Sequence, residues 1–173
     1  MIRKATLDDL DAISAIYDAI HDREEAGLAV IGWNRAIYPT RASGKASILA
    51  GDMYVLEEEG RVLAAAKINQ EQVPEYANAQ WQWEAPEEKI LVLHTLVVDP
   101  EKGRGGYGKA FVAFYEDMAR NMGCPYLRMD TNARNTIARQ LYQSLGYAEV
   151  GLVDCQFNGI PGVQLVCLEK KVN

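Results

Sequence analysis

A cluster of glycines in the middle of the chain has the composition of an anion-binding loop. Four glycines between positions 103 and 108 follow an apolar stretch that ends at Val98, and a segment with helical periodicity begins directly after them. Glycine lets the backbone approach a ligand closely, and the first free N–H groups of a helix point toward negative charge. The pattern therefore predicts a loop that holds a phosphorylated cofactor.

Two phosphate-binding patterns match this loop only in part. The glycine spacing reads G-x-G-x-x-G, and Asp130 follows at about the distance of a ribose-binding acid in a dinucleotide site. That fold needs several more parallel strands, but only one helix and one hairpin are predicted after Asp130. The loop also reads G-x-x-x-x-G-K up to Lys109, yet Ala110 replaces the Ser or Thr that holds magnesium. Both interpretations are therefore disfavoured.

Length, charge and cysteine content restrict the class of protein. A chain of 173 residues is predicted to form a single domain over residues 1–173. Its 18 Lys and Arg against 24 Asp and Glu give a net charge of -6, which disfavours nucleic acid and favours a neutral or cationic substrate. The lack of a long apolar run predicts no membrane partner. Three cysteines without a C-x-x-C pair are typical of reduced thiols, so we expect a cytoplasmic protein.

Hydrophobic periodicity predicts the elements that position the loop. Apolar residues at helical spacing indicate four helices, and apolar runs between turn residues indicate strands, four of which form two antiparallel hairpins. The strands before and after the third helix are predicted to be parallel, so the sheet is mixed. The predicted helices span about 10–20, 41–49, 107–122 and 138–145, and the predicted strands span 53–57, 61–68, 89–98, 126–130, 147–157 and 163–169.

Residues 69–88 show neither period and are rich in Gln, Glu and aromatic side chains, which we interpret as a candidate lid. Aromatic side chains attract cations through their ring faces, so those of this stretch and of the preceding loop could line an amine pocket or could equally belong to the core. These candidates are Trp33, Tyr38, Tyr76, Trp81 and Trp83.

A second motif selects the cofactor. The run N-T-I-A-R-Q-L-Y-Q-S-L-G-Y, from Asn135 to Tyr147, resembles the Asn-x-x-Ala-x-x-x-Tyr-x-x-x-Gly-Phe/Tyr segment of the GNAT acetyltransferase superfamily. The loop resembles that family's Q/R-x-x-G-x-G/A pattern in its second half, from Gly106 to Ala110, whereas Gly103 stands where the family has Gln or Arg. The two motifs and the element order resemble the family from about Ile2 to the end of the chain.

The resemblance implies a fold and a cofactor. The expected fold class is α/β, with a GNAT-like mixed β-sheet whose central parallel strand pair is splayed and flanked by helices. Acetyl-CoA is the implied acyl donor, its pantetheine arm lying in the splay against the backbone of one strand, and no metal is implied. The implied cofactor-binding residues are Leu96, Val97, Val98, Gly103, Arg104, Gly105, Gly106, Tyr107, Gly108, Lys109 and Asn135.

The resemblance also implies catalytic residues. Tyr142 matches the family tyrosine near the thioester sulfur, and a phenol with a reference pKa of about 10 is protonated at neutral pH and can act as a general acid. Many relatives carry a Glu base where this chain has Val92, which cannot accept a proton. His94, on the same strand face, is then a candidate to relay a proton through water. The rival carboxylates are Glu71, Glu75 and Glu84.

These observations predict an acetyl-CoA-dependent N-acetyltransferase that acts by direct attack of an amine. The expected acceptor is a primary amine of a small molecule or peptide, and the resemblance makes a homodimer plausible. The alternative is a non-catalytic module that binds acetyl-CoA as a sensor or interaction partner.

Overall fold

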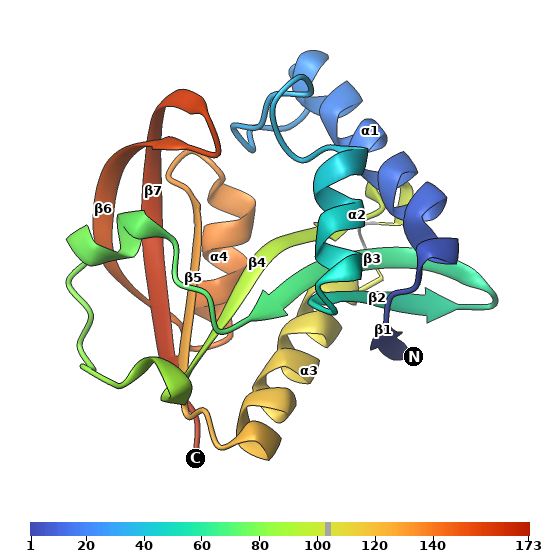
Figure 1. The fold of residues 1–173 in the computed structure, drawn as a ribbon. Helices are drawn as coiled ribbons and strands as arrows, with labels where there is room; N and C mark the ends of the chain where they lie inside the picture. Colours follow the sequence, from blue (N-terminus) through green and yellow to red (C-terminus); the bar gives the residue numbers. More distant parts are fainter. Residues whose placement is uncertain (103–104) are drawn as a thin grey trace.

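The computed structural model describes residues 1–102 and 105–173, and within them seven strands form one mixed sheet (Figure 1). The strand order is β1-β2-β3-β4-β5-β7-β6, and every neighbouring pair is antiparallel except β4 and β5. The strands are β1 (Ile2–Lys4), β2 (Met53–Glu58), β3 (Arg61–Asn69), β4 (Ile90–Val98), β5 (Tyr126–Asn132), β6 (Ala148–Phe157) and β7 (Ile160–Lys171). The helices are α1 (Leu10–Glu25), α2 (Arg41–Leu49), α3 (Tyr107–Met122) and α4 (Thr136–Ser144).

The parallel pair at the centre of the sheet separates along its length. β4 pairs with β5 only up to Leu93 and Met129, after which β4 continues beside β3 and β5 continues beside β7. At this point Thr95 has a φ of 45°, and the register between β3 and β4 shifts, which marks a bulge. The predicted α/β fold with a splayed central strand pair is thereby confirmed.

Both faces of the sheet are covered by helices. On one face, α1 and α2 pack against β2, β3 and β4, with Ile13 and Tyr17 in contact with the cluster that contains Val55 and Ala65. On the other face, α3 and α4 pack through a second cluster, whose centre includes the fully buried Phe111. The two clusters hold the splayed strands from opposite sides, which fixes the geometry at the point of separation.

Residues 70–89 form a third layer, which covers β5, β6 and β7 on the same face as α1 and α2 (Figure 1). The segment contains two short 3-10 helices, Pro74–Asn78 and Glu87–Lys89, and its Tyr76 is 3% exposed. The Gln80 N–H donates to the carbonyl of Val150 at 3.0 Å. Tyr76 and its half-buried neighbours thus fix the segment to the sheet, which contradicts the interpretation of residues 69–88 as a lid.

Short-range signals explain where the elements begin and turn. The Thr40 side chain accepts a hydrogen bond from the Ser43 N–H at 3.2 Å, which caps α2. Asn158 and Gly159 have φ values of 49° and 85°, as a two-residue hairpin turn requires, so β7 begins at Ile160 and not at the expected position 163. No helix within the described ranges is long and apolar enough to cross a bilayer.

Candidate active site

A cavity of about 370 Å³ opens where β4 and β5 separate. The ends of the two strands line it through His94 and Asp130, and α4 lines it through Tyr142. The loop between α1 and α2 closes it with Trp33 and Tyr38. Because Tyr142 belongs to the core on the α3 and α4 face, the cavity joins groups from both faces of the sheet.

Tyr142 brings an unpartnered phenol to this cavity. Asn135 caps α4 by accepting a hydrogen bond from the Ala138 N–H at 3.1 Å, and seven residues are about two helical turns, so Asn135 and Tyr142 lie along one side of the helix. Tyr142 is 7% exposed, and its burial raises the pKa of the hydroxyl above the usual value, so the group stays protonated. Among the described residues this hydroxyl has no hydrogen-bond partner, which leaves it free to donate into the cavity.

Asp130 brings a carboxylate to the same cavity. Burial raises the pKa of Asp130 to about 6, while the Tyr76 hydroxyl, which donates to its Oδ2 at 2.7 Å, opposes that rise and the nearby Glu75 charge adds to it. A carboxylate that titrates near neutral pH in a cavity is a candidate functional group. The glycine pattern suggests Asp130 only as a ribose ligand. Its place near the carboxyl end of β5 also points to a ligand site, because parallel strands end at the same sheet edge, where ligands bind.

A series of hydrogen bonds through the Asn69 side chain holds His94 in one orientation. Its Nε2 lies 2.9 Å from the Asn69 Oδ1, which also accepts the Glu71 N–H at 3.0 Å, while the Asn69 Nδ2 donates to Asp52 at 2.8 Å. These contacts identify the Asn69 oxygen, so the Nε2 of His94 carries the hydrogen and Nδ1 carries the lone pair. Burial, and then the Lys67 charge, lower the pKa of His94 to about 4. The imidazole is therefore neutral at physiological pH.

The other predicted bases lie in less suitable places. Glu71 lines the cavity, but its carboxylate faces the Lys67 ammonium at 3.4 Å. Glu75 follows Pro74 at the start of a 3-10 helix, and Glu84 is exposed. Val92 is fully buried beneath residues 70–89.

The candidate aromatic residues divide into two groups. Trp33 and Tyr38 line the cavity, where their rings meet edge to face with centroids 6.2 Å apart. Their position is fixed because the Tyr38 hydroxyl hydrogen-bonds the Thr95 hydroxyl on β4. The other three aromatic candidates belong to residues 70–89 and pack against the sheet from there: Tyr76, Trp81 and Trp83.

The described part of the glycine loop leads into α3, and residues 105–109 do not line the cavity themselves. Gly103 and Arg104 fall outside the described residues. Gly106 caps α3 with a φ of 73°, and the first N–H groups of α3 have no partner within the helix. Those N–H groups belong to Tyr107, Gly108 and Lys109, which follow the exposed Gly105.

Gly108 brings α3, α4 and β4 together. A Cβ at this position would lie 3.3 Å from Leu141 and 3.9 Å from Val98, so only a glycine permits this approach without a shift of its neighbours. The Tyr107 hydroxyl turns away from α4 and donates to Glu58 at 2.7 Å. α4 therefore contacts the glycine loop through Leu141 and the cavity through Tyr142.

The end of β4 offers free backbone to a ligand. Beyond Leu93 the edge of β4 that faces β5 has no strand partner among the described residues. Leu96 lines the cavity, Val97 is 2% exposed beneath α1, and Val98 is half-buried beside the glycine loop. An extended arm could hydrogen-bond this edge as an added strand would.

Comparison with known proteins agrees with this geometry. Residues 14–147 match the family model described as the acetyltransferase (GNAT) family. The chain is 28% identical over 103 residues to the uncharacterized N-acetyltransferase YycN of Bacillus subtilis, a stretch that makes up 57% of this chain and 62% of that protein.

Three solved structures share the fold. An acetyltransferase of the GNAT family from Streptococcus agalactiae superposes with a TM-score of 0.83 at 21% identity, over 100% of this chain and 95% of its own. A ribosomal-protein-alanine N-acetyltransferase from Brucella melitensis gives 0.70 at 24% identity, over 99% of both chains. YncA from Salmonella typhimurium, solved with its cofactor acetyl-CoA, gives 0.69 at 20% identity, over 100% of this chain and 94% of its own. The chain belongs to the GNAT family of acetyltransferases.

Proposed function

We propose that this protein transfers an acetyl group from acetyl-CoA to a primary amine, with Asp130 as the general base and Tyr142 as the general acid. One observation carries the proposal: the cavity at the strand splay is lined both by a buried carboxylate with a pKa of about 6 and by an unpartnered buried phenol. Acyl transfer to an amine needs both kinds of group, one to take a proton and one to give one.

The cofactor fits the free backbone groups beside the cavity. The first N–H groups of α3 would hold the diphosphate, since a helix N-terminus attracts anions. Asn135, at the start of α4, lines the cavity. The open edge of β4 from Leu96 to Val98 would bind the pantetheine arm. The acetyl-CoA bound to YncA supports this cofactor, because the two chains share the fold.

The chemistry follows from the two groups in the cavity. The acceptor enters as an ammonium ion, and the ionised Asp130 takes one proton from it, which frees the nitrogen lone pair. The nitrogen attacks the thioester carbonyl and, as the C–S bond breaks, passes its second proton to solvent water, to which Asp130 also releases the first. Tyr142 donates a proton to the departing thiolate and is reprotonated from the solvent, so the products are the N-acetyl amide, coenzyme A and one net proton.

His94 is better suited to orient water than to act as the base. A group with a pKa of about 4 is a weak acceptor for an amine proton, whereas a base is most effective when its pKa lies near the working pH. Its neutral ring can still accept a hydrogen bond from a water through Nδ1. A backbone N–H at the end of β4 would stabilise the oxyanion.

The acceptor is expected to be a small amine that carries a positive charge. The cavity is lined by two carboxylates, Glu71 and Asp130, against one ammonium, Lys67, and by the aromatic pair Trp33 and Tyr38. A volume of about 370 Å³ must hold the acetyl end of the cofactor as well, which leaves room for one side-chain-sized amine. A peptide N-terminus would satisfy the same chemistry.

A turnover assay tests the proposal. Release of coenzyme A thiol is followed with acetyl-CoA and separate panels of polyamines, amino acids, aminoglycosides and peptides, using the wild type, Tyr142→Phe and Asp130→Asn. Thiol release with one acceptor, lost in both variants while acetyl-CoA still binds, is the expected result. Binding of acetyl-CoA without turnover on any panel would instead favour the sensor, and full activity of either variant would refute its role.

A further inference from the structure

We infer that Tyr76, a buried residue of the 70–89 segment, is a positioning residue that orients and tunes the catalytic carboxylate Asp130. This inference rests on the proposed role of Asp130 as the base. Tyr76 does not line the cavity itself, so it acts on the reaction only through the side chain that it contacts.

The contact is a single, well-placed hydrogen bond. The Tyr76 hydroxyl donates to the Oδ2 of Asp130 at 2.7 Å, a distance typical of a bond to a charged oxygen. With Oδ2 held, the carboxylate cannot rotate freely, and Oδ1 is left as the oxygen that can take a proton. The bond also favours the ionised form of Asp130 against the effect of burial.

Tyr76 is itself held in place by its neighbours in residues 70–89. Its carbonyl accepts the Trp81 Nε1–H at 2.8 Å, and the two rings meet edge to face with centroids 5.1 Å apart. The guanidinium of Arg128 lies 4.2 Å from the Trp81 ring centre and donates to the Trp83 carbonyl at 3.0 Å. Because Arg128 and Asp130 are two apart on β5, the strand that carries the base also anchors the layer that orients it.

Among the groups around Asp130, the Tyr76 hydroxyl has the largest effect on the pKa of the carboxyl. Glu75 lies on the same segment as Tyr76, and the groups on the other surrounding elements are phenols, thiols and the neutral imidazole. No cation forms an ion pair with Asp130 among the described residues. The phenols, thiols and imidazole are those of Tyr38 on the α1–α2 loop, His94 on β4, Tyr142 on α4, Cys155 on β6 and Cys167 on β7. The cavity is also lined by the Lys67–Glu71 ion pair.

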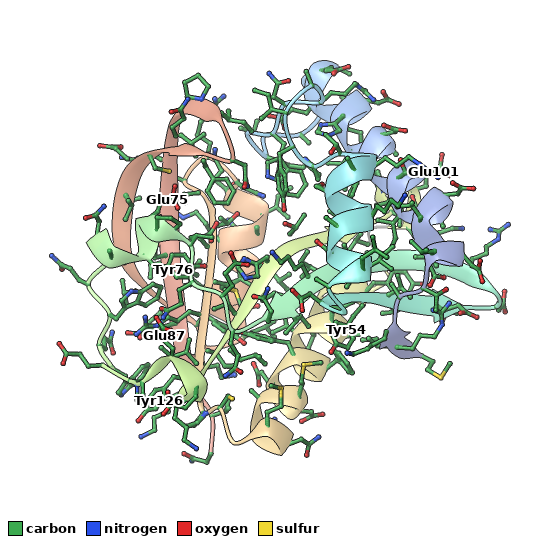
Figure 2. All side chains as sticks on the ribbon, viewed as in Figure 1. Tyr54, Glu75, Tyr76, Glu87, Glu101 and Tyr126 are labelled. Atoms are coloured by element: carbon green, nitrogen blue, oxygen red, sulfur yellow. The ribbon has the colours of Figure 1, made fainter. Side chains whose placement is uncertain are left out.

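The test compares Tyr76→Phe with Tyr126→Phe. Figure 2 labels both residues; Tyr126 begins β5 and packs against the buried cluster to which Tyr76 belongs. Each substitution removes one hydroxyl, but only Tyr76 contacts Asp130. We expect the acidic limb of the kcat/KM profile to move up by about one pH unit in Tyr76→Phe, a drop of about fivefold at pH 6 that disappears by pH 9, while Tyr126→Phe leaves the limb in place.

A direct titration separates this inference from the proposed function. The carboxyl carbon signal of Asp130, identified by its loss in Asp130→Asn, is followed by NMR against pH in the wild type and both Phe variants. A higher midpoint in Tyr76→Phe alone supports the inference even if turnover is absent, and 3-fluorotyrosine at position 76, a stronger donor that keeps the fold, should lower the midpoint. An unchanged midpoint, or activity reduced equally at every pH, would overturn the role of Tyr76 and leave that of Asp130 standing.

Discussion

Replacing Asp130 by Asn should stabilise the protein at neutral pH while it abolishes turnover. The pKa of this carboxyl rises from 3.8 to about 6 on folding, so ionisation is harder in the folded state by about two pKa units. At about 1.4 kcal/mol per unit, the ionised carboxylate costs about 3 kcal/mol of folding free energy. Asn keeps an oxygen that can accept the Tyr76 hydrogen bond, but it carries no charge to bury.

The pH dependence of stability shows which way the substitution should act and how to measure it. Well below pH 3.8 the carboxyl is protonated in both the folded and unfolded states, so its burial has no charge penalty. Between pH 4 and 6 the unfolded chain ionises first, which favours unfolding, and above pH 6 the penalty is constant. The free energy of unfolding of Asp130→Asn minus that of the wild type, from urea denaturation, should therefore grow by about 2.4 kcal/mol from pH 4 to pH 7, which corresponds to roughly 5 to 10 °C in Tm. A difference that does not change with pH would refute the buried, raised-pKa carboxylate.

Three further substitutions test other parts of the site. Tyr142→Phe should lower kcat by a factor of roughly a hundred to ten thousand with an unchanged Kd for acetyl-CoA, and a kcat within threefold of wild type would exclude the general acid. Asn135→Ala removes the cap of α4 and should lower the free energy of unfolding by about 1 kcal/mol, whereas an unchanged Tm would show that the cap is dispensable. Gly32→Ala places a Cβ 2.1 Å from the Asn132 Nδ2 at a φ of 84°, so it should displace the α1–α2 loop and raise KM for the amine while acetyl-CoA affinity stays the same; equal weakening of both ligands would contradict a site confined to the acceptor.

Much of the fold could be predicted because its signals are local. The helix cap at Thr40, the glycine at position 123 that ends α3 with a φ of 67°, and the order of strands and helices all act within a few residues. Strand β1 was missed because its three residues are too few to show a period, and it forms only by pairing with β2. The placement of β7 between β5 and β6 likewise depends on contacts between distant segments.

The candidate site was predictable only where a motif carried it. Tyr142 and Asn135 follow from their spacing on one helix, but the presence of Asp130 in the same cavity as Tyr142 depends on how far β4 and β5 separate, which no local pattern encodes. Residues 70–89 show the limit most clearly. Their polar, aperiodic sequence gives no sign that Tyr76 is buried against Asp130, because the bonds that hold the segment join it to β5, β6 and β7.

A crystal structure of the protein with acetyl-CoA tests the central claim most directly. We expect the diphosphate at the start of α3 and the thioester sulfur in the cavity at the strand splay. The sulfur should lie within hydrogen-bond distance of the Tyr142 hydroxyl, and the acetyl carbon should lie between the sulfur and Asp130. A sulfur bound outside this cavity, or one separated from both side chains by protein, would contradict it.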